Sequence, residues 1–99
     1  MDIAREIRKA IETGTVILGT KGSMKALKNG EAKLIIYAAN CAPDTKDDMA
    51  HYAALSNVPT YEYKGTGVDL GMVCGKPFIV SMLAVNSPGE SMILSAEGA

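Results

Sequence analysis

A glycine-containing turn at Gly19-Thr20-Lys21-Gly22-Ser23 follows an apolar run and precedes a helical pattern. Free backbone N–H groups and the helix dipole meet at such a point, so anions bind there readily. The phosphate-loop pattern G-x-x-x-x-G-K-[ST] is absent because Lys21 precedes Gly22, and GxGxxG is absent too. Two interpretations stay open from these residues alone: a strand-to-helix turn with a solvated lysine, or a contact with a phosphate or RNA.

Lysines recur along the segment that follows this turn. Lys21, Lys25 and Lys28 fall at i, i+4 and i+7, so one face of a helix carries all three. Residues 21–33 contain four lysines and one acid, a local charge of +3. Such a stripe can neutralise backbone phosphates of RNA. An ordinary solvated helix face gives the same spacing and is the commoner cause of it.

The sequence Gly75-Lys76-Pro77-Phe78 contains the only phenylalanine of the chain. On pattern alone, Phe78 begins a buried strand. The alternative is that Phe78 is held outward against an unstacked RNA base, with Lys76 near a phosphate.

Residues typical of catalysis or metal binding form no recognisable group. His51 is the only histidine and has no partner in a known motif, and Cys41 and Cys74 form no CxxC pair. Three acids near residue 45 suit the positive end of a helix. No nucleophile–base arrangement stands out either. We therefore predict no enzymatic activity, no metal site and no cofactor.

Helical and strand patterns alternate along the whole chain. Asp2 and Thr66 are suited to cap helices, and Gly14 and Gly30 to end them. The predicted elements, in order, are a helix at 3–13, a strand at 15–18, a helix at 20–28, a strand at 33–38, a helix from residue 43, a strand at 60–63, a helix at 67–74, a strand at 78–85 and a terminal helical turn from residue 88.

This alternation predicts an α/β protein, a three-layer α/β/α sandwich whose sheet is covered on both faces. The run 33–38 is continuously apolar, which is typical of a central strand. Three loops of interest connect strands and helices, at 19–23, 40–43 and 75–78. Spacing alone does not say whether these loops converge at one edge of the sheet.

Composition limits the choice of partners. The 99 residues fit one domain, residues 1–99, and 47% of them are hydrophobic, enough for a packed core. The net charge of −1 means that an RNA partner would have to be recognised by local patches. Residues 1–13 lack the apolar core of a signal peptide, and no run approaches the roughly 20 apolar residues of a membrane span. With free thiols, these features predict a cytoplasmic protein that does not contact membranes.

Several stretches, in order, resemble the thirty-e family of archaeal and eukaryotic large-subunit ribosomal proteins. They are Val16–Lys21, Ala32–Ile36, Ala39–Pro43, Leu70–Phe78 and Pro88–Ser91, and together they cover nearly the whole chain. The wider family includes the seven-Ae proteins, which usually have Asn-Glu in the first loop where this chain has Lys21-Gly22. That difference favours the thirty-e branch. The short N-terminus and the sequence Gly-Lys-Pro-Phe resemble archaeal members.

The resemblance implies a four-stranded mixed sheet and three loops at one end that bind kink-turn RNA, an internal loop bent sharply between two stems. By analogy, Lys21 and Asn40 would contact bases or phosphates of the kink, Gly19 and Gly75 would let backbone approach RNA, and Phe78 would pack on an exposed nucleotide. With the basic helix face included, the predicted RNA-binding residues are Gly19, Thr20, Lys21, Ser23, Lys25, Lys28, Asn40, Gly75, Lys76, Pro77 and Phe78.

The implied partners are ribosomal RNA and other proteins of the large subunit, with the free protein a monomer. Two other functions remain as alternatives. One is a kink-turn protein of a small ribonucleoprotein outside the ribosome. The other is a small nucleotide-binding regulator or enzyme that uses the Gly19 loop, which the missing phosphate motifs argue against.

Overall fold

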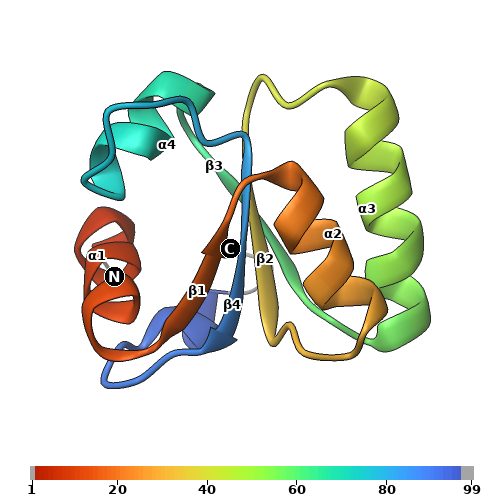
Figure 1. Cartoon of the computed structure of the whole chain (residues 1–99), viewed down its shortest axis with the longest axis horizontal. Coiled ribbons are helices and arrows are strands. Elements are labelled where there is room, and N and C mark those ends of the chain that lie inside the picture. Colours follow the sequence, from red (N-terminus) through yellow and green to blue (C-terminus); the bar gives the residue numbers. More distant parts are fainter. Residues whose placement is uncertain (1, 97–99) are drawn as a thin grey trace.

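The computed structural model of the chain describes residues 2–96 and shows helices and strands in alternation (Figure 1). Its elements are α1 (Ile3–Thr13), β1 (Thr15–Leu18), α2 (Thr20–Lys28), β2 (Leu34–Ala38), α3 (Pro43–Ser56), β3 (Thr60–Tyr63), α4 (Gly67–Val73), β4 (Met82–Ser87) and the 3₁₀ helix η1 (Ile93–Ala96). The predicted order of elements is confirmed.

The four strands form one mixed sheet in the order β1-β4-β2-β3. β4 is antiparallel to both β1 and β2, whereas β2 and β3 are parallel. The last strand in sequence therefore lies inside the sheet, between the first and the second. β2 is central, as its continuous apolar run predicts.

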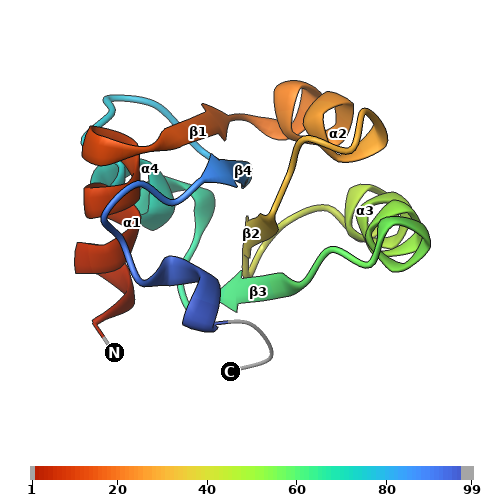
Figure 2. The same ribbon diagram turned by 90° about the horizontal axis from the view of Figure 1, so that it is seen from below.

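Helices cover both faces of the sheet (Figure 2). On one side, α1, α4 and η1 enclose a core to which β2 contributes Leu34 and Ile36. On the other side, α2 and α3 enclose a second core around Ile35 of the same strand. Successive side chains of a strand point to opposite faces, so a strand covered on both faces must be apolar throughout. All three residues are fully buried, and burying each contributes about 1.5 to 3 kcal/mol. The predicted three-layer sandwich is confirmed.

The helix starts follow the predicted caps. The side chain of Asp2 accepts a hydrogen bond from the Arg5 N–H at 3.3 Å at the start of α1. At the start of α4, Thr66 and Asp69 form a reciprocal capping box. Such caps satisfy backbone donors that have no partner within the helix.

The prediction that the last strand begins at Phe78 is wrong, because β4 begins at Met82. Residues 78–81 turn toward α4 instead: Val80 donates its backbone N–H to the carbonyl of Gly67 at 3.0 Å. Pro77, just before this segment, has no backbone N–H to donate to a sheet. The apolar residues that suggested a strand are explained partly by packing, because Val80 is fully buried in the core beneath α4.

Residues 91 and 92, which follow β4, are held against α1. The carboxylate of Glu6 accepts hydrogen bonds from the Met92 N–H at 2.7 Å and the Ser91 hydroxyl at 3.0 Å. The predicted helical turn lies later than expected, because residues 89–90 form a turn and the 3₁₀ helix begins at Ile93.

Candidate nucleic-acid interface

The strand order brings the three predicted loops to one end of the sandwich. Because β4 is antiparallel to β1 and β2, its first residues lie beside the last residues of both: Leu18 pairs with Leu83, and Tyr37 pairs with Met82. β3 is parallel to β2 and ends there too. This end lies at the top of Figure 1. We call it the loop end, and it consists of residues 19–23, 39–42, 64–66 and 75–81.

Backbone hydrogen bonds join the segments of the loop end. Gly19 donates to the carbonyl of Met82 at 2.8 Å, and Ala38 donates to that of Ser81 at 2.9 Å. Residues far apart in the sequence are thereby fixed next to each other. A binding surface built in this way is largely formed before a ligand arrives.

The first loop turns at Gly19, whose φ of 100° suits glycine alone among the common residues. Thr20 is half-buried and Lys21 is exposed. Packing explains the glycine at position 22, because a Cβ there would lie 2.6 Å from a methyl carbon of Ile17. Any larger residue here would require the Ile17 side chain to shift, so glycine allows α2 to lie close to β1.

Ser23 lies inside the protein and is 0% exposed. Its hydroxyl donates to the carbonyl of Ile17 at 3.4 Å, and its backbone N–H donates to Gly19. The Ser23 side chain thus connects α2 to β1 and is not accessible at the surface.

The lysine stripe is exposed but reaches beyond the loop end. Lys21, Lys25 and Lys28 are all exposed on α2, as their spacing predicts. At a rise of about 1.5 Å per residue, Lys28 lies about 10 Å from Lys21 along the helix axis. Its ammonium lies 4.7 Å from the centre of the Tyr52 ring on α3, a cation–π contact. Only Lys21 belongs to the loop end itself.

Asn40 follows β2 and is exposed, yet it has a structural contact. Its side-chain oxygen accepts a hydrogen bond from the Gly67 N–H at 3.0 Å. The carbonyl of Gly67 in turn accepts from Val80. Asn40 is thereby connected through α4 to the segment that precedes β4.

The Gly75–Phe78 segment leaves α4 and passes over the end of the sheet. Gly75 has a φ of 73°, again a conformation that favours glycine. Gly75, Lys76, Pro77 and Phe78 are all exposed, and the Phe78 side chain is 54% accessible. Phe78 is therefore held outward at the loop end and does not begin a buried strand.

Two glycines of α4 that no sequence motif marks, Gly67 and Gly71, position this segment. A Cβ on Gly71 would overlap the carbonyl oxygen of Phe78, and one on Gly67 would lie 2.6 Å from the Ile79 side chain. The two glycines are four residues apart and so share one face of α4. Their spacing was visible in the sequence, but the segment they pack against was not.

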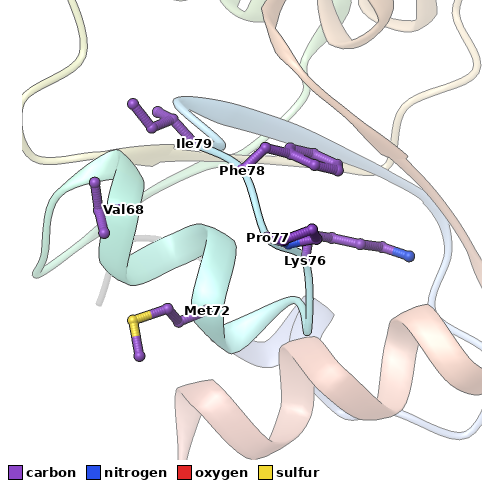
Figure 3. Close-up of a pocket in the computed structure, with 6 residues that line it drawn as sticks. All are labelled: Val68, Met72, Lys76, Pro77, Phe78 and Ile79. Atoms are coloured by element: carbon purple, nitrogen blue, oxygen red, sulfur yellow. The ribbon is translucent and has the colours of Figure 1, made fainter.

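An open groove of about 320 Å³ lies along the same segment and α4 (Figure 3). In this view Phe78 and Lys76 extend in one direction, and Ile79 extends in the other. An aromatic ring beside an ammonium group suits a nucleotide, because the ring can stack on the base and the ammonium can approach the phosphate. The groove is lined by Val68, Met72, Lys76, Pro77, Phe78 and Ile79.

The charged residues of the loop end are all lysines, and one ion pair lies beside it. Lys46, in the first turn of α3, lies 3.8 Å from the Glu62 carboxylate and 5.5 Å from the centre of the Tyr37 ring. Within residues 2–96 this is the only ion pair. Lys21 and Lys76 therefore carry ammonium groups that no carboxylate of the described part neutralises by direct contact.

The described residues include no group of three or more His, Cys, Asp or Glu side chains placed to hold a metal ion. Burial raises the pKa of the Cys74 thiol to about 11 and also raises that of Cys41. Because the thiolate is the reactive form, both cysteines are poor nucleophiles at neutral pH.

Within residues 2–96, no helix has the length and apolar character that crossing a membrane requires.

The fold and the loop end define a class: a small α/β/α domain that presents exposed lysine, asparagine and phenylalanine side chains from converging loops. Residues 1–95 match the Ribosomal protein L7Ae/L30e/S12e/Gadd45 family, and the chain belongs to this family. The resemblance inferred from the sequence is confirmed.

Its similarity to individual members extends over nearly the whole chain. The large ribosomal subunit protein eL30 of Methanococcus vannielii is 53% identical over 95 residues, covering 96% of this chain and 90% of that protein. The eL30 protein of Methanothermobacter thermautotrophicus is 50% identical over 98 residues, covering 99% and 100%. That of Methanopyrus kandleri is 47% identical, covering 95% and 86%. These relatives are named as ribosomal proteins and not as enzymes, which agrees with the absence of a catalytic motif.

Proposed function

We propose that this protein is a structural component of the large ribosomal subunit and binds a kink-turn of ribosomal RNA at its loop end. The observation that supports this most is the convergence of the Gly19 turn, Asn40 and the Gly75–Phe78 segment in a chain of this family. Protein recognition of RNA favours loops and bends, where unstacked bases are accessible. A compact surface with one exposed aromatic ring suits such a site.

Each loop has a distinct role in this proposal. Gly19 and Gly75 lack side chains where the space above them is open, so RNA can approach the backbone. Lys21 and Lys76 neutralise phosphates on either side of the kink. Phe78 stacks on an unpaired base, with Thr20 and Pro77 completing the surface around these contacts.

The lysine stripe extends this surface along one stem. Lys25 and Lys28 lie progressively farther from the loop end on α2, so they would meet the phosphate backbone of a stem that runs beside the helix. We leave the Ser23 side chain out of the interface because it is buried.

In the cell we expect the protein in the cytoplasm, on ribosomes, with ribosomal RNA and neighbouring large-subunit proteins as its partners. The free protein would be a monomer. Sedimentation of a tagged copy in a sucrose gradient tests this: it should migrate with large subunits and leave that fraction when ribosomes are digested with ribonuclease. Migration with small RNA particles instead would favour a kink-turn protein outside the ribosome.

A nucleotide-binding function makes a different prediction. A ligand at 100 times its dissociation constant stabilises a protein by about 2.7 kcal/mol. Kink-turn RNA should therefore raise the melting temperature, whereas ATP and GTP should leave it unchanged. Stabilisation by a nucleotide alone would support the alternative.

A further inference from the structure

Residues 64–66, which connect β3 to α4, bring a further lysine to the loop end. β3 is parallel to β2, and Ala38 pairs with Tyr63, so the chain leaves both strands at the same end of the sheet. Lys64 is the first residue after β3 and is exposed. It belongs neither to the lysine stripe of α2 nor to any stretch that carries the family resemblance.

The backbone that carries Lys64 is held on both sides. Gly65 accepts a hydrogen bond from the Ala39 N–H at 2.9 Å and donates its own N–H to the carbonyl of Tyr63 at 2.9 Å. Thr66, the next residue, starts α4 with its capping box. Only the side chain of Lys64 must then be ordered when a ligand binds, which keeps the entropic cost of binding low.

The ammonium group of Lys64 is available because the acids nearest to it in the sequence have other partners. Glu62 pairs with Lys46 at 3.8 Å. The Asp69 carboxylate accepts a hydrogen bond from the Thr66 N–H at 2.9 Å. Within residues 2–96, no carboxylate lies at ion-pair distance from Lys64. Its charge can therefore attract a phosphate.

Lys21 and Lys64 stand at opposite edges of the loop end. In the order β1-β4-β2-β3, Lys21 follows the edge strand β1 through the Gly19 turn, and Lys64 follows the edge strand β3. Neighbouring strands lie about 4.8 Å apart, so three spacings separate the two edges by about 14 Å. A ligand that contacts both lysines must therefore span the width of the sheet.

We propose that Lys64 binds backbone phosphate of the second stem of the kink-turn, the stem that does not follow α2. The lysine stripe of α2 directs one stem down the side of the sandwich, away from the loop end. The bend sends the other stem in a different direction, and Lys64 is the lysine at the opposite edge that can meet it. The two stems are thus bound from opposite edges of one sheet. This inference rests on the proposed binding of a kink-turn RNA.

RNAs with one stem cut short test this assignment. The three probes are a complete kink-turn and two versions in which one stem or the other ends close to the bend. With the complete RNA, Lys64→Ala should lower the affinity about tenfold and reduce the magnitude of the salt slope by about 0.9, the value for one phosphate contact. The melting temperature of the variant should match wild type because the side chain is exposed. Lys64→Arg keeps the charge and should keep the salt slope.

The double variant Lys25→Ala, Lys28→Ala reports on the stem along α2. Its loss of affinity should disappear when that stem is cut short, whereas the loss in Lys64→Ala should disappear only when the other stem is cut short. Lys33→Ala, at the opposite end of the sheet, is the control for charge and should have a much smaller effect.

The proposal is overturned if both losses disappear with the same stem, or if the loss in Lys64→Ala persists with both shortened RNAs. Wild-type affinity for the complete kink-turn in Lys64→Ala or in the α2 double variant would overturn it too. If wild-type protein fails to distinguish a kink-turn from a duplex, the proposed function fails instead.

Discussion

Phe78 is the residue for which the local sequence pattern and the family resemblance predict different surroundings. The pattern placed it at the start of a buried strand, whereas the resemblance placed it outward against an exposed nucleotide. In the structure its side chain is 54% exposed, while Val80, two residues on, is fully buried. The two side chains therefore have different roles: Val80 packs in the core beneath α4, and Phe78 is available to a ligand.

Replacing Phe78 by alanine should weaken RNA binding and leave the fold intact. The side chain has little burial to lose, so the free energy of unfolding should change by less than about 1.5 kcal/mol. Loss of one base–aromatic stack should cost about 1 to 3 kcal/mol of binding. Urea unfolding and an RNA titration on the same preparation measure both quantities.

Val80→Ala is the control for this experiment, since it removes buried methyl groups from the same segment. It should lose about 1.5 kcal/mol or more of stability, while its folded fraction binds RNA nearly as well as wild type. If Phe78→Ala shows that pattern instead, Phe78 does not belong to the interface.

Lys21 makes a second prediction at this scale. Its side chain is exposed in the first turn of α2, so Lys21→Ala should not unfold the domain. Hydrogen bonds to charged groups are worth about 1.5 to 3 kcal/mol, and the RNA affinity should fall by that amount. Lys33→Ala changes the charge equally at the opposite end of the sheet and should have a much smaller effect. Equal effects of the two variants would mean that Lys21 acts only through long-range charge.

Among the elements, α4 and the segment after it were the hardest to predict. The capping box at Thr66 is local in sequence, so the start of α4 was predictable. The path of residues 75–81 depends on contacts of their backbone with Gly67 and Gly71, which no pattern of apolar residues records. An apolar run could equally be a strand or a segment packed on a helix.

Gly71→Ala tests whether this packing positions the RNA-binding segment. The new Cβ would meet the backbone oxygen of Phe78, which cannot move away by rotating a side chain. The segment must shift, so we expect a loss of about 1 to 3 kcal/mol of stability together with weaker RNA binding. Met72→Ala is the control for stability, because this exposed neighbour on α4 can be shortened without moving the segment. Wild-type binding by Gly71→Ala would show that the position of Phe78 is not critical.

The contact between α1 and residues 91–92 predicts a dependence of stability on pH. Hydrogen bonds from Met92 and Ser91 lower the pKa of the Glu6 carboxyl from its ordinary value of 4.5. A carboxyl group whose pKa is lower in the folded state contributes stability at pH values above its ordinary pKa. This contribution is lost as the pH falls through the lowered pKa. Glu6→Gln should therefore destabilise the protein at pH 7 but less at pH 3.

Urea unfolding of both proteins at the two pH values measures this difference. Glu12→Gln is the control, because it makes the same change of charge on α1 without a hydrogen bond to residues 91–92. A loss of stability in Glu6→Gln that does not shrink on acidification would mean that the carboxylate charge does not hold residues 91–92 against α1.

For the whole molecule, the alternation of helices and strands was enough to predict the layers but not the interface. Convergence of the loops follows from the order β1-β4-β2-β3, which inserts the last strand between the first two. That order depends on pairings between distant segments, such as Leu18 with Leu83. Asn40 likewise could be predicted as an RNA contact by resemblance, whereas its contact with Gly67 could not.

The overall charge of −1 gives this protein little general attraction for nucleic acid. Binding without regard to structure depends mainly on phosphate contacts, so it should be weak here. Recognition must then depend on the shape of the bend and on stacking at Phe78. The protein is therefore expected to recognise the bend of the RNA and its unstacked bases, and not only the negative charge of the phosphates.

The most direct test is one titration of the protein against a kink-turn RNA and against the same two stems joined as a continuous duplex, at equal salt. Equal length and nearly equal charge leave the bend and its unpaired bases as the difference between the two RNAs. Specific sites are typically bound at least 1,000-fold more tightly than non-specific ones, and we predict a preference of at least about 100-fold for the kink-turn. Equal affinities for the two RNAs would contradict the account.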